Sequence, residues 1–189
     1  MGLELSILDL IQKLHTSVGD QVMCAITKLG NGGAIWIALM LGLLLVPKTR
    51  RCGVVLAAAL VINTILCNGI LKPLVARPRP CDVNTAIQLL ISRPSDWSFP
   101  SGHTSASFAS ASALFFYTYR SGGVMVPESQ AVAKKLWKPA LVLGFLIAFS
   151  RLYLYMHYPT DVLGGMLLGC LSGYAGCRIM AFWMERKQR

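Results

Sequence analysis

Charged residues are scarce in this sequence. Asp, Glu, Lys and Arg together make up 14% of the 189 residues, whereas a soluble domain has about a quarter. Hydrophobic residues make up 54%, and the mean hydropathy is +0.56. This lack of charge, combined with long apolar runs, argues against an ordinary soluble domain and predicts a protein with several membrane spans.

Acidic residues are much scarcer than basic residues. The sequence has 8 Asp and Glu against 18 Lys and Arg, which gives a formal net charge of +10. In a soluble protein such an excess would suggest nucleic-acid binding. Here the basic residues mostly flank apolar runs, where they set membrane topology. We therefore expect membrane lipids as partners and no nucleic acid, while the oligomeric state stays open.

Signatures of metal sites and disulfide frameworks are also missing. The six cysteines have no spacing typical of either, and at least four lie in apolar segments, where they are expected to act as small buried hydrophobes. No cluster of carboxylates with ligand spacing is present to hold a metal ion. We therefore expect metal-independent chemistry without a cofactor.

The N-terminal stretch has neither the basic leader nor the cleavage site of a signal peptide. Instead, apolar residues recur in it at helical spacing, namely Leu3, Ile7, Leu10, Ile11 and Leu14. This pattern predicts that residues 1–30 are an amphipathic segment with a helix lying in the membrane interface.

Five apolar segments follow, at about residues 33–46, 52–74, 104–119, 139–153 and 162–183. They predict an all-α, multi-span transmembrane helical bundle of about five spans, with a polar loop at 76–99 and a basic loop at 120–138. The first segment is short against the roughly 20 residues of a typical span, so a longer or double-passing element, and hence six spans, stays open. We expect one domain over 1–189, with the bundle at 31–184 and a basic cytoplasmic tail at 185–189.

Basic residues predict the orientation of this bundle. Eleven of the 18 Lys and Arg fall on one side of the predicted spans, which is therefore expected to be cytoplasmic together with the C-terminus. They are Lys48, Arg50, Arg51, Arg120, Lys134, Lys135, Lys138, Arg178, Arg186, Lys187 and Arg189. Most of the other cations lie at the outer ends of the second to fourth spans, where an anionic ligand would explain them.

Five polar groups at those outer ends suit a phosphate ligand. Alternating span directions bring the end of the second span, the start of the third and the end of the fourth to one face. Lys72, Arg79 and Arg151 would neutralise phosphate oxygens. Ser101 and the Gly102 amide would add donors near a helix N-terminus, where an anion is favoured.

Two histidines on the same face would divide the chemistry of phosphoryl transfer. One of His103 and His157 can attack phosphorus while the other protonates the departing oxygen. Asp161 follows His157 by four residues, so its carboxylate could accept a bond from one imidazole nitrogen and orient the other. The sequence therefore predicts His103, His157 and Asp161 as catalytic residues.

These motifs, Lys-x6-Arg-Pro, Pro-Ser-Gly-His and Ser-Arg-x5-His-x3-Asp, occur at Lys72–Pro80, Pro100–His103 and Ser150–Asp161. In this order and spacing they resemble the signature of the type 2 phosphatidic acid phosphatase superfamily. The resemblance implies a helical bundle, a phosphohistidine on His157, His103 as general acid and Asp161 as support for the nucleophile. It also implies that phosphate is bound by Lys72, Arg79, Ser101, Gly102 and Arg151.

Small bacterial members of this family include undecaprenyl pyrophosphate and phosphatidylglycerophosphate phosphatases. The resemblance therefore implies a membrane lipid phosphatase with a lipid phosphate or pyrophosphate as substrate. Because the cluster of basic residues predicts that the opposite side is cytoplasmic, we expect the active site on the outer face of the plasma membrane. The compact chain favours undecaprenyl pyrophosphate. Phosphatidylglycerophosphate and phosphatidate are alternatives, and so is a non-catalytic scaffold or transporter of the same fold.

Three further polar residues fit no position in the signature. Arg77 and Arg93 are interpreted as loop cations near lipid headgroups, with contact to a substrate pyrophosphate as the alternative. His15, in the N-terminal segment, is interpreted as interfacial and without a catalytic role.

Overall fold

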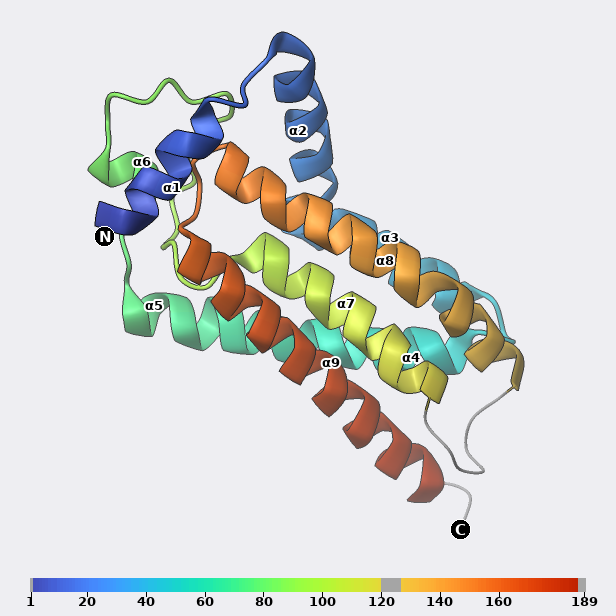
Figure 1. Ribbon diagram of the computed structural model, residues 1–189. Coiled ribbons are helices and arrows are strands. Elements are labelled where there is room, and N and C mark those ends of the chain that lie inside the picture. Colours follow the sequence, from blue (N-terminus) through green and yellow to red (C-terminus); the bar gives the residue numbers. More distant parts are fainter. Residues whose placement is uncertain (1, 120–126, 187–189) are drawn as a thin grey trace.

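The computed structural model describes residues 2–119 and 127–186, and within these ranges the chain is helical and contains no strand (Figure 1). This confirms the all-α class. The helical elements are α1 (Gly2–Gln12), α2 (Ser17–Leu29), the 3-10 turn η1 (Asn31–Gly33), α3 (Ala34–Leu45), α4 (Arg50–Thr64), the π-helical η2 (Ile65–Leu71), α5 (Lys72–Val75), α6 (Pro80–Val83), α7 (Gly102–Tyr119), α8 (Pro127–Tyr153) and α9 (Pro159–Arg186). Of the basic residues used for orientation, Arg120, Lys187 and Arg189 lie outside the described residues.

Two stretches of the described chain are long and apolar enough to cross a membrane, Arg50–Val83 and Pro159–Arg186. A third arises if the bent pair Ser17–Leu29 and Asn31–Leu45, which meet at 45°, forms one span. The bend lies beside Gly32 and Gly33, whose positive φ values of 57° and 74° are readily adopted by glycine. The multi-span bundle is therefore supported, while the count of five spans also depends on α7 and α8 and stays a prediction.

Helix α7 is the centre of the bundle and packs against α4, α8 and α9 (Figure 1). Its sequence is rich in Ser and Ala, and small side chains let helices approach closely in an apolar environment. The glycines of α9 have the same effect. A Cβ atom on Gly169 would lie 2.5 Å from the main-chain oxygen of Ser105 in α7, and one on Gly176 would lie 2.7 Å from the nitrogen of Ala59 in α4. These glycines therefore serve the close packing of the helices.

Helix α8 begins earlier than the sequence predicts. The prediction of a basic loop at 120–138 is wrong for residues 127–138. Helix α8 begins at Pro127 and continues through Pro139. A proline interrupts the hydrogen bonding of a helix without always ending it. Moreover, the first half of α8 is anchored by Ser129, a buried residue whose hydroxyl accepts a bond from the Cys52 amide at 3.2 Å.

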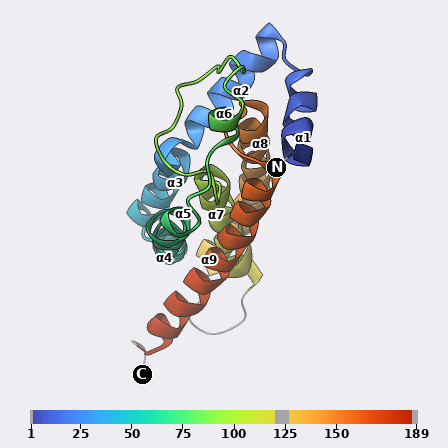
Figure 2. The ribbon, with the colours of Figure 1, turned by 90° about the vertical axis from the view of Figure 1, so that its left-hand side faces the viewer.

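The N-terminal segment lies with α6 and the long loop before α7 at one end of the bundle, opposite the end of α9 (Figure 2). Helix α1 buries Leu8 completely, while Leu3 and Leu10 are exposed. Asp9 accepts a hydrogen bond from the hydroxyl of Tyr155 at 2.7 Å, which joins α1 to the segment between α8 and α9. These contacts place α1 beside the segments that carry the sequence motifs.

Candidate active site

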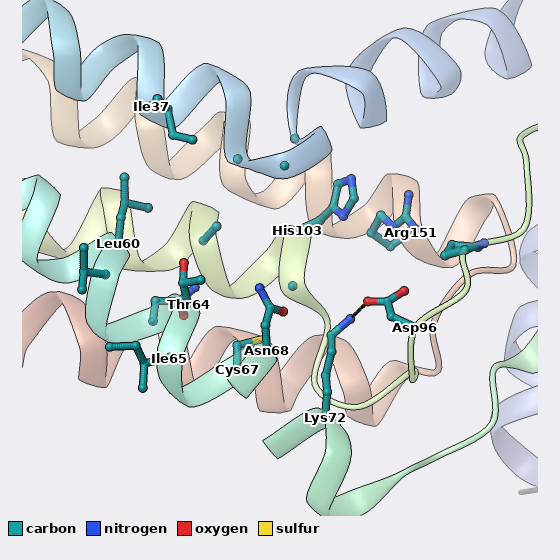
Figure 3. A pocket seen from close by; sticks show the side chains of 18 of the residues that line it. Ile37, Leu60, Thr64, Ile65, Cys67, Asn68, Lys72, Asp96, His103 and Arg151 are labelled. Carbon is teal, nitrogen blue, oxygen red and sulfur yellow. Dashed lines mark hydrogen bonds and ion pairs between the residues drawn. The ribbon is translucent and has the colours of Figure 1, made fainter. Parts of the chain in front are cut away.

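A cavity of about 600 Å3 opens at this end of the bundle. One part of its wall is polar and contains Lys72, Arg79, Asp96, His103, Arg151 and His157. The other part is apolar and contains Ile37, Met40, Ala57, Leu60, Val61 and Ile65 from α3, α4 and η2. Figure 3 shows both parts, with Ile37 and Leu60 on one side and Lys72, Asp96 and Arg151 on the other. The cavity therefore joins a charged site to an apolar groove.

Three cations from different elements reach the polar part. Lys72 follows the π-helical η2, a type of helix that is often found at functional sites. Arg79 immediately precedes α6, and Arg151 lies in the last turn of α8. All three are buried. The structure thus brings together the cations that the sequence predicts to bind phosphate.

The guanidinium of Arg79 is fixed by main-chain oxygens. Its Nε donates to the oxygen of Asp96 and its Nη1 to the oxygen of Met156, both at 2.8 Å. Arg151 donates from Nη1 to the hydroxyl of Thr27 at 2.7 Å, whereas its buried Nε has no hydrogen-bond partner in the structure. A buried donor without a partner is costly, so this Nε is available to an anion in the cavity.

Asp96 was not singled out in the sequence and lies between two of these cations. Its carboxylate pairs with Lys72 Nζ and with Arg79 Nη2, the latter at 2.6 Å. Burial raises the pKa of Asp96, but the hydrogen bonds and charges of Lys72 and Arg79 outweigh it and lower the pKa to about 2. Asp96 is thus ionised at neutral pH and supplies the negative charge at the cation cluster.

His157 lies in the short segment between α8 and α9 and is only 1% exposed. Burial lowers its pKa to about 3, and the charges of Arg151 and Arg79 act in the same direction against the opposing effect of Asp161. The imidazole is therefore neutral at neutral pH. Its Nε2 lies 3.1 Å from Arg79 Nη1, a donor, so Nε2 is unprotonated and its electron pair accepts this hydrogen bond.

The other ring nitrogen of His157 faces a buried carboxylate. Nδ1 lies 3.6 Å from Asp161 Oδ2 and 3.4 Å from the hydroxyl of Ser98. Ser98 donates to the same Asp161 oxygen, which also accepts from the amide of Tyr158 at 2.8 Å. Sequence reasoning missed Ser98, although it lies three residues before Ser101 of the Pro-Ser-Gly-His motif. Asp161 does not line the cavity but holds His157 from behind.

Arg77 has a different environment from the one predicted. Its Nη1 donates to the second oxygen of Asp161 at 2.7 Å, and its Nη2 pairs with Glu4 of α1 at 2.6 Å. The guanidinium also lies 3.9 Å from the ring centre of Tyr158. The interpretation of Arg77 as a headgroup cation is therefore wrong, because its side chain is 17% exposed and engaged by two carboxylates.

Arg93, by contrast, lies away from the cavity wall. Its side chain is 61% exposed and pairs with Asp82 at 2.6 Å. This position agrees with a cation at the protein surface. His15 stacks on Tyr153 with the ring centres 4.1 Å apart and lies outside the cavity wall, while its interfacial position stays a prediction.

His103 lies in the first turn of α7 and reaches the cavity from the side opposite Lys72 (Figure 3). Its Nε2 is 2.9 Å from Asn31 Oδ1, at the bend between α2 and α3. Gly30 packs on the ring, because a Cβ atom there would lie 2.7 Å from Cδ2. The bend, whose role the sequence did not reveal, therefore forms the support for His103.

The Pro-Ser-Gly-His turn places its two predicted phosphate ligands differently. Gly102 lines the cavity, and a Cβ atom there would lie 3.9 Å from Lys72 Cε. Ser101 is completely buried and is not part of the cavity wall. Its hydroxyl accepts from Thr104 at 2.9 Å, and its amide donates to the main-chain oxygen of Asp161 at 3.0 Å. In this structure Ser101 thus connects α7 to α9 and does not reach the cavity.

Within residues 2–119 and 127–186, no group of three or more His, Cys, Asp and Glu side chains is placed to hold a metal ion. The positive charge at the cavity comes from Lys72, Arg79 and Arg151. A neutral imidazole beside these cations is suited to nucleophilic attack on a phosphate group.

Comparison with known proteins places this chain among phosphatases of one family. Residues 52–185 match the model of the PAP2 superfamily. An undecaprenyl-diphosphatase from Sulfolobus acidocaldarius is 26% identical over 179 residues, which are 95% of this chain and 79% of the relative. The undecaprenyl-diphosphatase BcrC of Bacillus subtilis is 29% identical, over 85% of this chain and 74% of its own. The lipid A 4'-phosphatase of Bacteroides thetaiotaomicron is 27% identical, over 85% and 69%.

Two solved structures share the fold. The transmembrane PAP2 type phosphatidylglycerolphosphate phosphatase from Bacillus subtilis superposes with a TM-score of 0.73 at 26% identity, covering 93% of this chain and 83% of the other. Aquifex aeolicus LpxE superposes with a TM-score of 0.71 at 26% identity, covering 93% and 95%. Since the family model covers most of the sequence and its relatives are phosphatases, the chain belongs to the PAP2 superfamily and is a membrane phosphatase.

Proposed function

We propose that this protein hydrolyses the terminal phosphate of a lipid diphosphate, with undecaprenyl pyrophosphate as the preferred substrate. The observation that carries the proposal is the shape of the cavity, in which the cation cluster opens into an apolar groove between α3 and α4. Ile37, Val61 and Ile65 of this groove are also exposed on the surface of the bundle. A phosphate headgroup and the first part of its lipid chain would fit this combination.

In the proposed first step, the Nε2 electron pair of His157 attacks the terminal phosphorus. Burial and the charges of Arg151, Lys72 and Arg79 lower the pKa of His103 to about 2, and the negative charge of the bound phosphate raises it so that His103 carries a proton. The bond from phosphorus to the bridging oxygen breaks, and His103 donates this proton to that oxygen, so a lipid monophosphate leaves. The proton on His157 Nδ1 is stabilised by Asp161, because the ring becomes positively charged as the nitrogen–phosphorus bond forms. Lys72, Arg79 and Arg151 compensate the charge on the phosphate oxygens.

In the second step, water attacks the phosphohistidine. His103, now neutral, accepts a proton from this water, the nitrogen–phosphorus bond breaks, and inorganic phosphate leaves. His157 regains its neutral form, and His103 regains the proton for the next cycle. The predicted role of Ser101 as a phosphate ligand would require its hydroxyl to turn toward the cavity, whereas Gly102 already borders it.

The choice of a diphosphate is supported by the names of two similar proteins, both undecaprenyl-diphosphatases. The second candidate is a monophosphate lipid, supported by the superposition on a phosphatidylglycerolphosphate phosphatase. Purified protein in detergent should be given undecaprenyl pyrophosphate, phosphatidylglycerophosphate and phosphatidate side by side, with His157→Ala as the control. We expect the highest kcat/KM for the diphosphate, and a higher value for either monophosphate would reject this preference.

We also propose that the cavity faces the outer side of the plasma membrane. In a variant otherwise free of cysteine, Ser95→Cys in the loop before α7 should react with an impermeant maleimide in intact cells. Lys134→Cys, on an exposed position of α8, should react only after the membrane is opened. Both positions are exposed in the fold, so the opposite pattern would place the active site in the cytoplasm.

A further inference from the structure

Asp96 occupies the position that the proposed function gives to the substrate. Its carboxylate bridges Lys72 and Arg79, two of the three cations expected to bind the terminal phosphate. A carboxylate carries one negative charge and two acceptor oxygens, so it resembles part of a phosphate group. A substrate phosphate that binds these cations therefore has to displace Asp96.

The surroundings of Asp96 permit this displacement. The side chain is 50% exposed and belongs to the loop before α7, so it can turn away without disturbing the core. Arg79 does not depend on it, because hydrogen bonds from Nε and Nη1 to two main-chain oxygens hold the guanidinium in place. Removal of the carboxylate would thus leave the cation positioned and free to bind another anion.

We propose that Asp96 is a specificity-determining residue that selects doubly charged terminal phosphates against singly charged phosphodiester headgroups. The inference rests on the proposed function, in which the same cations bind the substrate. Coulomb attraction grows with the charge of the ligand. A phosphodiester would exchange one negative charge for another and gain little, whereas a terminal phosphate brings additional charge and gains attraction.

Selection against phosphodiester headgroups matters because this enzyme works among membrane lipids. Three residues of the groove, Ile37, Val61 and Ile65, are exposed on the surface of a membrane protein, so we expect phosphodiester lipids beside the cavity, each with a phosphate that cations could bind. Since the pKa of Asp96 is about 2, its carboxylate is charged at any physiological pH and competes continuously. Arg151, with a buried Nε that lacks a partner, remains available to the additional oxygens of a terminal phosphate.

The test compares Asp96→Asn with the wild type in micelles of fixed substrate content. Phosphatidylcholine is replaced stepwise by phosphatidylglycerol, a singly charged phosphodiester. We expect little inhibition of the wild type, but at least a fivefold loss of kcat/KM in Asp96→Asn. Glu128→Gln is the matched control, because it removes the same charge from an exposed residue of α8 that lies outside the cavity. It should behave like the wild type.

Binding of inorganic phosphate provides a readout that needs no turnover. Thermal unfolding in detergent should show that Asp96→Asn binds phosphate about tenfold more tightly than the wild type, as expected when one competing charged contact is removed. Asp96→Glu, which retains the charge, should stay near the wild type. Weaker phosphate binding in Asp96→Asn, or equal inhibition by phosphatidylglycerol in both proteins, would overturn the proposal. An inactive wild type would instead refute the proposed function, and the phosphate titration would still decide the role of Asp96.

Discussion

The two histidines of the site have very different surroundings. His157 is buried, and both of its ring nitrogens face fixed groups, Arg79 on one side and Ser98 with Asp161 on the other. Among the described residues, the side chain of His103 has one hydrogen-bond partner, Asn31 at the bend before α3. The difference fits their proposed roles, because a nucleophile requires a fixed direction of attack, whereas a proton donor has to release its hydrogen bond to reach the leaving oxygen.

Removal of the proposed nucleophile, His157, should have the largest effect on kcat. His157→Ala should abolish phosphate release, with a loss of at least about 10,000-fold in kcat, as found when a covalent nucleophile is deleted. Trapping with radiolabelled substrate should detect a phosphoprotein in the wild type and none in the variant. Substantial residual hydrolysis in a correctly folded His157→Ala protein would contradict the assignment.

Removal of the second histidine should have a smaller and substrate-dependent effect. His103→Ala should lower kcat on a lipid diphosphate by about 100- to 10,000-fold, the usual range for a lost general acid. An aryl phosphate with an acidic leaving group needs no proton and should lose less. Equal losses on both substrates, measured as phosphate release, would argue against His103 as the acid.

Arg77 tests whether the fixed surroundings of His157 matter for catalysis, because it pairs with Asp161 beside that ring. Arg77→Gln should lower kcat by about 10- to 100-fold with little change in KM, because one oxygen of the buried Asp161 loses a charged partner and the His157 ring loses its fixed orientation. Arg77→Lys should recover part of this loss. Arg93→Gln is the control, since Arg93 pairs with Asp82 away from the cavity, and its kcat should stay within about twofold of the wild type. An unchanged kcat in Arg77→Gln would show that Asp161 is held without it.

Asn31, the partner of His103, should give the smallest effect when it is replaced. Asn31→Ala removes the only side-chain bond described for His103, so kcat on the lipid substrate should fall by about three- to tenfold, the loss expected for one hydrogen bond. Hydrolysis of an aryl phosphate should be nearly unchanged, since that reaction needs no proton donor. A larger loss on the aryl phosphate would mean that Asn31 contributes to phosphate binding.

Sequence reasoning located the parts of the site that depend on helix direction. Lys72, Arg151 and His103 lie at helix ends that alternating helices bring to one face, and their polar character stands out in an apolar chain. It also identified His157 and Asp161 as a pair. The two residues are four positions apart and lie on either side of the start of α9. These inferences needed only the order and polarity of the segments.

The residues that were missed depend on how the irregular segments fold. Asp96 and Ser98 lie in the loop before α7, which has no periodic pattern, although a hydrogen bond from the Ser98 amide to the main-chain oxygen of Arg77 fixes its path. Arg77 was misinterpreted because one of its partners, Glu4, lies in α1, which is distant from Arg77 in the sequence. Spacing along the chain contains no signal for such contacts.

The close packing of α7 on α9 has a consequence for the chemistry. His103 lies in the first turn of α7, while His157 and Asp161 lie around the start of α9. The two helices touch backbone to backbone at Gly169, and the amide of Ser101 is bonded to the oxygen of Asp161. The distance between the attacking and the protonating group is therefore set by the close backbone packing of α7 and α9, to which Gly169 contributes from about two helical turns after Asp161.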